Sequence, residues 1–144
     1  MIGGRFLHQL RHDRQGSTII EFAILAPVLF SLMLGVLQVG LHMHAYNAVR
    51  SVVTDTARFT TVEYQKDNDL TAEQVESRAI AYAVNPPYGL QIDNLTVNVT
   101  QPASAITGTK RFNIQVSYVP QGLLGFIGVG APTITVNRPV YVAT

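Results

Sequence analysis

The sequence predicts an α+β fold in which a long N-terminal helix leads into a small domain with a second helix and a roughly three-stranded antiparallel sheet. Three observations predict it. Residues 16–45 hold one formal charge, the carboxylate of Glu21, and are otherwise largely apolar. Apolar residues then recur at helical spacing to about Val84, and beyond Gly89 the period of the pattern changes to two.

Residues 17–41 are long and apolar enough to form a transmembrane helix. A span needs about 20 predominantly apolar residues to cross a hydrocarbon core about 30 Å thick. The preceding residues, 1–16, form a basic leader with three arginines, and positive residues favour the cytoplasmic side of a span. We therefore expect a single-pass protein of a bacterial inner membrane, with a cytoplasmic N-terminus and a periplasmic C-terminal domain.

Glu21 is the feature of this span that points to a function. A carboxylate inside hydrocarbon costs about 2.5 to 3.5 kcal/mol on insertion scales, so it usually faces a partner. Cleavage after Gly16 would create an α-amino group on Ser17, and such groups titrate near pH 7.7 to 8.0. Ser17 and Glu21 lie four residues apart on one helix face, and the amine of an adjacent copy could serve equally well. A simpler alternative is an acid at headgroup level that faces water.

The residues around Glu21 resemble the processing site of type IV pilin-like proteins. In that site a membrane aspartyl prepilin peptidase cuts after a glycine that is separated from a Glu-Phe pair by four residues, here Gly16 before Glu21 and Phe22. The longer pattern is similar to the TadE-like pseudopilins of the Tad (tight adherence) pilus system. Besides Glu21 and Phe22, it comprises Ala23, Ala26, Pro27, Gly35, Gly40, Ala57 and Arg58.

This resemblance, which covers roughly residues 10–60, implies a pilin-like fold and a structural role in pilus assembly. Gly16 and Ser17 would form the scissile bond, with Gly16, Glu21 and Phe22 recognised by the peptidase. Glu21 would then pair with an N-terminal amine during assembly. The implied partners are the prepilin peptidase, other pilins or pseudopilins, the Tad assembly platform and the membrane itself.

Within that system the sequence favours a minor pseudopilin used in initiation or assembly of Tad (Flp-type) pili for adherence. The resemblance implies that the major pilins are much shorter, whereas here some 80 residues follow Val62. The alternative is a signal-anchored periplasmic binding module without pilin-type processing, in which the helix is only a tether.

Residues 42–64 are expected to continue the helix outside the membrane. Apolar residues at helical spacing predict one buried face, made of Tyr46, Val49, Val52, Val53, Ala57 and Val62. The whole helix would then run from Ser17 to about Val62, which is roughly 70 Å at 1.5 Å per residue. The alternative is a break at the membrane surface near His42.

Residues 65–144 are expected to form the small α+β domain. Thr71 and Gln74 form a capping-box pattern that opens a second helix, which ends near Val84 before two prolines. Alternating residues predict three strands, at 95–100, at 111–118 and at 133–142. Pro139 restricts the last of them to a sheet edge or a break.

The segment 120–131 between the second and third strands is an apolar loop with four glycines. Its large apolar residues include Leu123, Leu124, Phe126 and Ile127. They either fold into the core of the domain or form an interaction surface for another subunit or for the membrane, because large exposed apolar patches mark such sites.

The composition argues against other functions. The chain has no cysteine, which excludes disulfides and thiolate metal sites. Without residues 1–16 it would have seven basic and eight acidic residues, whereas a nucleic-acid partner leaves a basic footprint. We find no nucleophile with an activating base and no phosphate-binding glycine loop. The expectation is a protein that is not an enzyme, without cofactor, metal or small-molecule substrate.

Overall fold

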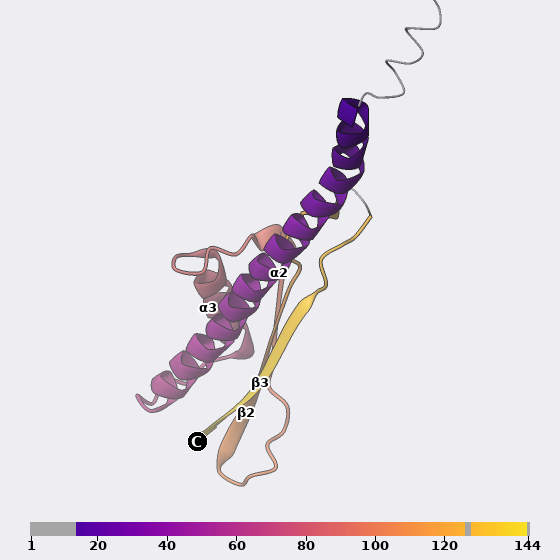
Figure 1. Cartoon of the computed structure of the whole chain (residues 1–144). Helices are drawn as coiled ribbons and strands as arrows, with labels where there is room; N and C mark the ends of the chain where they lie inside the picture. The colour runs from indigo at the N-terminus through magenta and orange to yellow at the C-terminus, as the bar shows by residue number, and fades with distance from the viewer. Residues whose placement is uncertain (1–13, 126–127, 144) are drawn as a thin grey trace, which may run out of the picture. The chain divides into compact units, whose positions relative to one another are not determined.

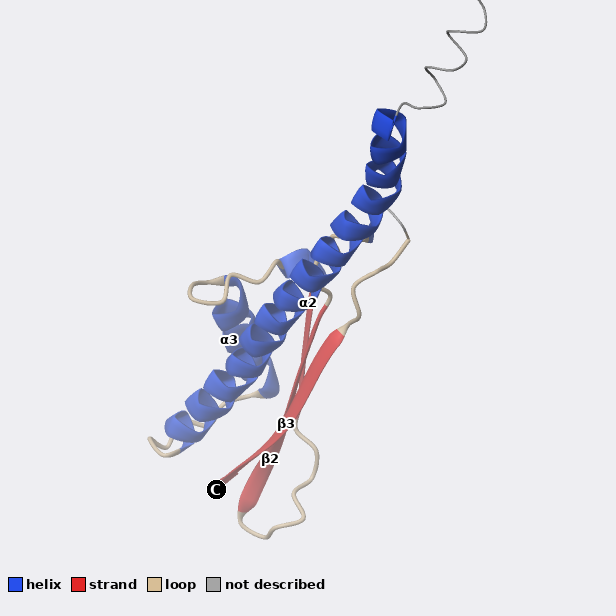
Figure 2. Ribbon diagram, in the orientation of Figure 1, coloured by secondary structure: helices blue, strands red, loops and turns tan. Residues whose placement is uncertain are grey.

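The computed structural model describes residues 14–125 and 128–143 and confirms the predicted α+β fold (Figures 1 and 2). The chain divides into two compact units, one that ends at Leu37 and one that begins at Gln38. The elements in order are α2 (Arg14–Tyr64), α3 (Ala72–Val84), the 3₁₀ turn η1 (Ile92–Asn94), β1 (Leu95–Thr100), β2 (Thr109–Tyr118) and β3 (Ile134–Ala143).

The first unit consists of the N-terminal part of α2. From Ser17 onward this helix is long and apolar enough to cross a membrane, and none of its most apolar window is buried by the rest of the chain. Pro27 lies inside the helix and leaves the carbonyl four residues earlier without its usual N–H donor. One turn later the Ser31 hydroxyl donates to the Pro27 carbonyl at 2.7 Å.

Helix α2 continues without a break at His42 and supplies one side of the domain core. Val49, Val52 and Val53 are fully or almost fully buried, as the helical spacing predicts. Two positions assigned to this face were wrong, because Tyr46 and Val62 are 40% and 37% exposed.

Two threonines lie in the buried face of α2 instead. Thr56 and Thr60 are completely buried. Their hydroxyls donate to the carbonyls of Val52 and Thr56, at 2.7 and 2.9 Å. Each hydroxyl is therefore satisfied within its own helix, which removes most of the cost of burying it.

Helix α3 begins with the predicted capping box. The Thr71 hydroxyl accepts a hydrogen bond from the Gln74 amide, and the Gln74 side chain accepts one from the Thr71 amide. Val75, Ala79 and Ala83 are buried, so α3 presents small side chains to the core. After the helix, the Leu90 amide donates to the Ala83 carbonyl at 2.8 Å and closes the turn that leads into the sheet.

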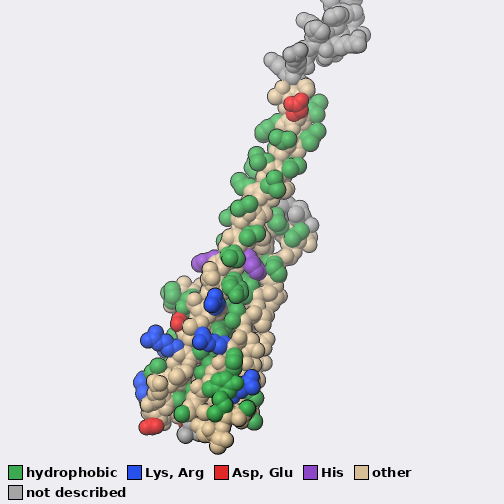
Figure 3. Space-filling view, turned by 60° about the horizontal axis from the view of Figure 1, so that its bottom comes forward, with side chains coloured by type: hydrophobic (Ala, Val, Ile, Leu, Met, Phe, Trp, Pro, Cys, Tyr) green, Lys and Arg blue, Asp and Glu red, His purple; other side chains and the backbone are tan. Residues whose placement is uncertain are grey.

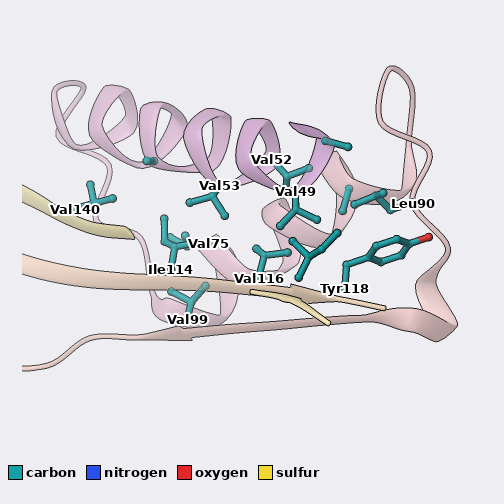
Figure 4. Close-up of a cluster of buried hydrophobic side chains, with 14 of the residues drawn as sticks. Val49, Val52, Val53, Val75, Leu90, Val99, Ile114, Val116, Tyr118 and Val140 are labelled. Carbon is teal, nitrogen blue, oxygen red and sulfur yellow. The ribbon is translucent and has the colours of Figure 1, made fainter. Parts of the chain in front are cut away.

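The three strands form an antiparallel sheet in the order β1-β2-β3. This is the predicted meander, and it places β3 with Pro139 at an edge. Alternate residues of β2, from Phe112 to Tyr118, point to one face of the sheet and are buried there. Side chains from α2, α3 and this face of the sheet meet in a single core (Figure 4).

Candidate functional site: the start of α2 and the loop before β3

The predicted scissile bond between Gly16 and Ser17 lies in the first turn of α2. The helix begins at Arg14, so the backbone is already helical on both sides of this bond. Glycine is among the weakest helix formers, at about 1 kcal/mol less favourable than alanine. The Gly16–Ser17 peptide bond therefore lies at the N-terminal end of α2, and Gly16 lowers the stability of the helix there.

Ser17 and Glu21 are brought together by the helix. The Ser17 hydroxyl donates to Oε1 of Glu21 at 3.3 Å. Glu21 is the only formal charge between Ser17 and Val49, and both residues are exposed. An amine at residue 17 would be attached to the same residue whose hydroxyl already reaches the carboxylate. The structure therefore brings the Ser17 side chain to the Glu21 carboxylate, as the helical spacing predicts.

The surface next to Glu21 is apolar and is not covered by other parts of the described chain. Phe22 is 70% exposed, and the exposed large hydrophobic side chains extend along the rest of this unit (Figure 3). They are Ile19, Ile20, Ile24, Leu25, Val28, Leu29, Phe30, Leu32, Met33, Val36 and Leu37. In water such a surface would be strongly unfavourable, so this part of α2 requires lipid or other apolar helices around it.

The loop between β2 and β3 is held at its beginning and exposed further along. The Leu123 amide donates to the Gln38 side-chain oxygen at 2.6 Å, and the Gln121 side chain donates to Gln91 at 2.9 Å. Leu123 and Val129 are 36% and 50% exposed, whereas Leu124 is partly buried. Phe126 and Ile127 lie outside the described residues. The described part of the loop thus keeps apolar side chains on the surface.

Polar contacts inside the domain connect distant parts of the chain. The Tyr88 hydroxyl donates to Oδ2 of Asp55 at 2.6 Å, and this bond to a carboxylate raises the pKa of Tyr88. Lys110 bridges to Asp69 at 2.8 Å; the hydrogen bond lowers the pKa of Asp69 and raises that of Lys110. The Tyr88–Asp55 pair connects the turn after α3 to α2, and the Lys110–Asp69 pair connects the loop before α3 to β2.

Two arginines of the domain, Arg58 and Arg138, were not among the predicted site residues. Arg138 lies on the same side of β3 as the buried Ile134, Val140 and Val142, and the Arg138 Nη1 atom donates to the Thr54 hydroxyl at 3.3 Å. The signal was present in the sequence, since a charged residue interrupts an otherwise apolar alternation.

Among the described residues, no three His, Cys, Asp or Glu side chains gather where they could hold a metal ion.

One apolar helix joined to a small α+β domain fits a single-pass membrane anchor with a domain outside the lipid. The comparison with known families makes this class more specific. The family described as TadE-like protein matches residues 16–58, which confirms the resemblance found in the sequence. The matched residues lie in α2, so the family match does not extend to α3 or the sheet. No curated protein and no solved structure matches this chain.

Proposed function

We propose that this protein is a minor pseudopilin of a Tad pilus system, matured by a prepilin peptidase that cuts between Gly16 and Ser17. The observation that carries the proposal is the family match over residues 16–58, which begins at the proposed cleavage glycine. In the part of the matched segment from Ser17 to Val49, Glu21 is the only formal charge, and the large apolar side chains around it are exposed. The role is structural, through contacts between subunits, and requires no catalytic group.

Cleavage would change the charge balance around Glu21. In the uncut chain its carboxylate receives the Ser17 hydroxyl, a neutral donor. After the cut, Ser17 would bear an amine with a pKa of about 7.7 to 8.0, which is largely protonated at neutral pH. A cation next to Glu21 offsets the cost of placing the carboxylate in hydrocarbon. Maturation thus prepares the helix to enter an apolar bundle of other pilin helices.

The proposed topology follows from the distribution of charge. Arg5, Arg11 and Arg14 precede the apolar segment that starts at Ser17 and would hold the leader on the cytoplasmic side of the inner membrane. The domain that begins near residue 42 would then lie in the periplasm. There it would meet other pseudopilins or the Tad assembly platform. The exposed Leu123 and its neighbours in the loop before β3 are one surface for such contacts.

The effect of Glu21→Ala on piliation tests this proposal. We expect the variant to be cleaved normally, because the bond at Gly16 is unchanged. The number of pili per cell should fall about tenfold or more, since the Ser17 amine loses its partner and remains an unpaired charge in the membrane. Glu21→Asp should retain part of the function, and Val36→Ala, on the same exposed helix, serves as the matched control.

Two results would count against the proposal. Normal piliation in the Glu21→Ala strain would remove the assembly role of the carboxylate. Loss of cleavage in that strain, with piliation restored by supplying a chain that starts at residue 17, would confine Glu21 to recognition by the peptidase.

A further inference from the structure

A groove lies along the domain between α2 and the outer edge of β3. It has a volume of about 470 Å³. Five residues of α2 and the residue that follows it line one side, and four consecutive residues of β3 line the other. They are Thr54, Ala57, Arg58, Thr61 and Val62 on the helix, Gln65 after it, and Arg138, Pro139, Val140 and Tyr141 on the strand.

Arg138 lines this groove, although the alternation of β3 places it on the side of the strand that faces the core. In β3 the residues on its side of the sheet are otherwise apolar, and Arg138 is paired in register with Ile114, which is fully buried. The Arg138 side chain instead leaves the core and reaches the Thr54 hydroxyl. A leucine or valine would extend the core at this place, so the arginine has a cost in packing that its one neutral hydrogen bond does not explain.

The groove is positively charged and its guanidinium groups have no acidic partner among the described residues. The Arg138 guanidinium donates a hydrogen bond to Thr54, and Arg58 lies one helical turn after Thr54 on the same helix face. Both guanidiniums therefore lie along the same part of the groove. The two ion pairs of the described chain join Lys66 to Glu63 and Lys110 to Asp69. No aspartate or glutamate is among the lining residues.

The acids nearest to Arg58 along α2 are already engaged elsewhere. Asp55 accepts the Tyr88 hydroxyl, and Glu63 accepts hydrogen bonds from Lys66 and Asn68. Lys and Arg side chains are visible between the hydrophobic patches on one face of this domain (Figure 3).

The shape of the groove favours a linear ligand over a compact one. From Thr54 to Gln65, the residue that follows α2 and whose amide still donates to the Thr61 carbonyl, this wall is about 16 Å long at 1.5 Å per residue, which matches about five residues of extended peptide. Val62 is 37% exposed and offers an apolar contact beside the two arginines. Pro139 has no N–H, so an added strand could not form a continuous ladder with β3. Recognition must therefore come from side chains.

We propose that this groove binds an extended acidic segment of a partner protein, with carboxylates paired to Arg58 and Arg138. Guanidinium-carboxylate pairs are short, charge-assisted and often bidentate, which gives them both strength and direction. The proposed assembly function supports only one part of this inference, the identity of the partner as a subunit or assembly protein of the same system. The binding site itself is independent of cleavage at Gly16.

Fluorescence anisotropy with a defined peptide tests the proposal. The full-length protein in detergent micelles is titrated into a labelled decapeptide of alternating Glu and Ser, with a Gln-Ser decapeptide as the control ligand. We expect the Glu peptide to bind about tenfold or more tightly than the Gln peptide, because only carboxylates can form the charged pairs. Raising the salt from low to high ionic strength should weaken binding of the Glu peptide.

Matched variants locate the binding. The double variant Arg58→Gln with Arg138→Gln should weaken binding of the Glu peptide about tenfold or more. Arg78→Gln is the control, because the Arg78 guanidinium lies over the rings of Phe59 and Tyr82 and outside the groove; it should leave the affinity unchanged. Circular dichroism shows whether each variant retains the helix and sheet content of the native domain.

Three outcomes would overturn the inference. Equal binding of the Glu and Gln peptides would exclude recognition of carboxylates, and equal binding by the native protein and the double variant would place the site elsewhere. Displacement of the peptide by inorganic phosphate at the same molar concentration would indicate a site for small anions only. None of these outcomes bears on maturation after Gly16, so the two proposals fail separately.

Discussion

The two halves of α2 form one continuous helix but present their apolar residues to different surroundings. In residues 17–37 the large apolar side chains are exposed, and Val36 is 76% exposed. In residues 45–60 the apolar face is closed by the domain, and Val52 is completely buried. The first half consists mainly of large residues such as leucine, isoleucine and phenylalanine, whereas the buried face of the second consists of valine, alanine and threonine.

This difference shows that hydrophobic content alone does not determine what a helix contacts. The small side chains on the buried face of the second half share one core with side chains of α3 and the sheet. Large side chains in the first half maximise apolar surface for a fluid or variable partner, such as lipid or other helices. The first half requires only apolar surroundings, whereas the second half requires the specific side chains of the domain that pack against it.

Removal of the largest fully buried side chain should have the most different effects on the stability of the two halves. Phe112 on β2 is completely buried, and its ring centre lies 5.8 Å from that of Tyr64. Phe112→Ala should cost about 3 to 5 kcal/mol of domain stability through lost burial and the cavity left behind. Hydrogen exchange on the full-length protein in micelles should show β2 amides losing protection while amides of residues 24–34 keep theirs. Equal loss in both regions would contradict the division.

The same substitution made in both halves sharpens the comparison. Val52→Leu should destabilise the domain by about 1 to 3 kcal/mol, because the added methylene has no space in a filled core. Val36→Leu should change stability by less than about 0.5 kcal/mol, because the side chain meets no fixed neighbour. Denaturant titration in micelles, followed by circular dichroism, measures both. Similar costs at the two positions would show that residues 17–37 also pack in one specific arrangement.

A polar contact that connects the second half of α2 to the rest of the domain should have a smaller effect. Tyr88→Phe removes the hydrogen bond to Asp55 and should cost about 1 kcal/mol, since the acceptor is charged but partly solvated. The hydrogen bond to Asp55 raises the pKa of Tyr88 in the folded protein. Its stabilising contribution is therefore fully present below the unfolded pKa of about 10 and is lost as the pH rises through the folded pKa.

The pH dependence provides the control for this contact. Denaturation at pH 8 and at pH 11 should show the native protein losing more stability than Tyr88→Phe over that interval. A constant difference between the two proteins at both pH values would mean that the Tyr88 proton is not involved.

The smallest effect is expected from a polar group in the first half. Ser31→Ala removes a hydrogen bond to the Pro27 carbonyl, which lies within the same helix and affects no other element. We expect a change below about 0.5 kcal/mol, measured by the hydrogen-exchange protection of residues 24–34. A large loss of protection would indicate that the Ser31 hydroxyl helps to hold the helix together after Pro27.

Most of the fold was predictable because its signals are local. The capping box at Thr71 starts α3, and the alternation from Phe112 to Tyr118 defines β2 and its buried face. Pro139 correctly indicated an edge strand, since a missing N–H is tolerated only where no neighbouring strand needs it. The length of α2 followed from continuous helical spacing, with no breaker near His42.

What was missed depends on contacts between residues far apart in the sequence. Thr56 and Thr60 are polar by type but satisfy their hydroxyls within the helix, so a hydropathy pattern assigns them outward. Tyr46 and Val62 are apolar, yet they remain 40% and 37% exposed. The contact of Tyr88 with Asp55 spans 33 positions and leaves no trace in the local pattern.

The candidate site was predictable only in part. The sequence singled out Glu21 because a lone charge in an apolar run is conspicuous, and the helix period placed Ser17 beside it. The groove with Arg58 and Arg138 required the strand register, which brings two residues 80 positions apart to the same surface. The partner of the Glu21 carboxylate in an assembled pilus involves another chain and stays a prediction.

The intact mass of the protein extracted from the membranes of piliated cells tests the central claim most directly. Maturation after Gly16 predicts a polypeptide that begins at Ser17, and a chain of full length in cells that lack the prepilin peptidase. A polypeptide that keeps its basic leader in cells that still build pili would contradict the account and leave a domain on a simple membrane tether.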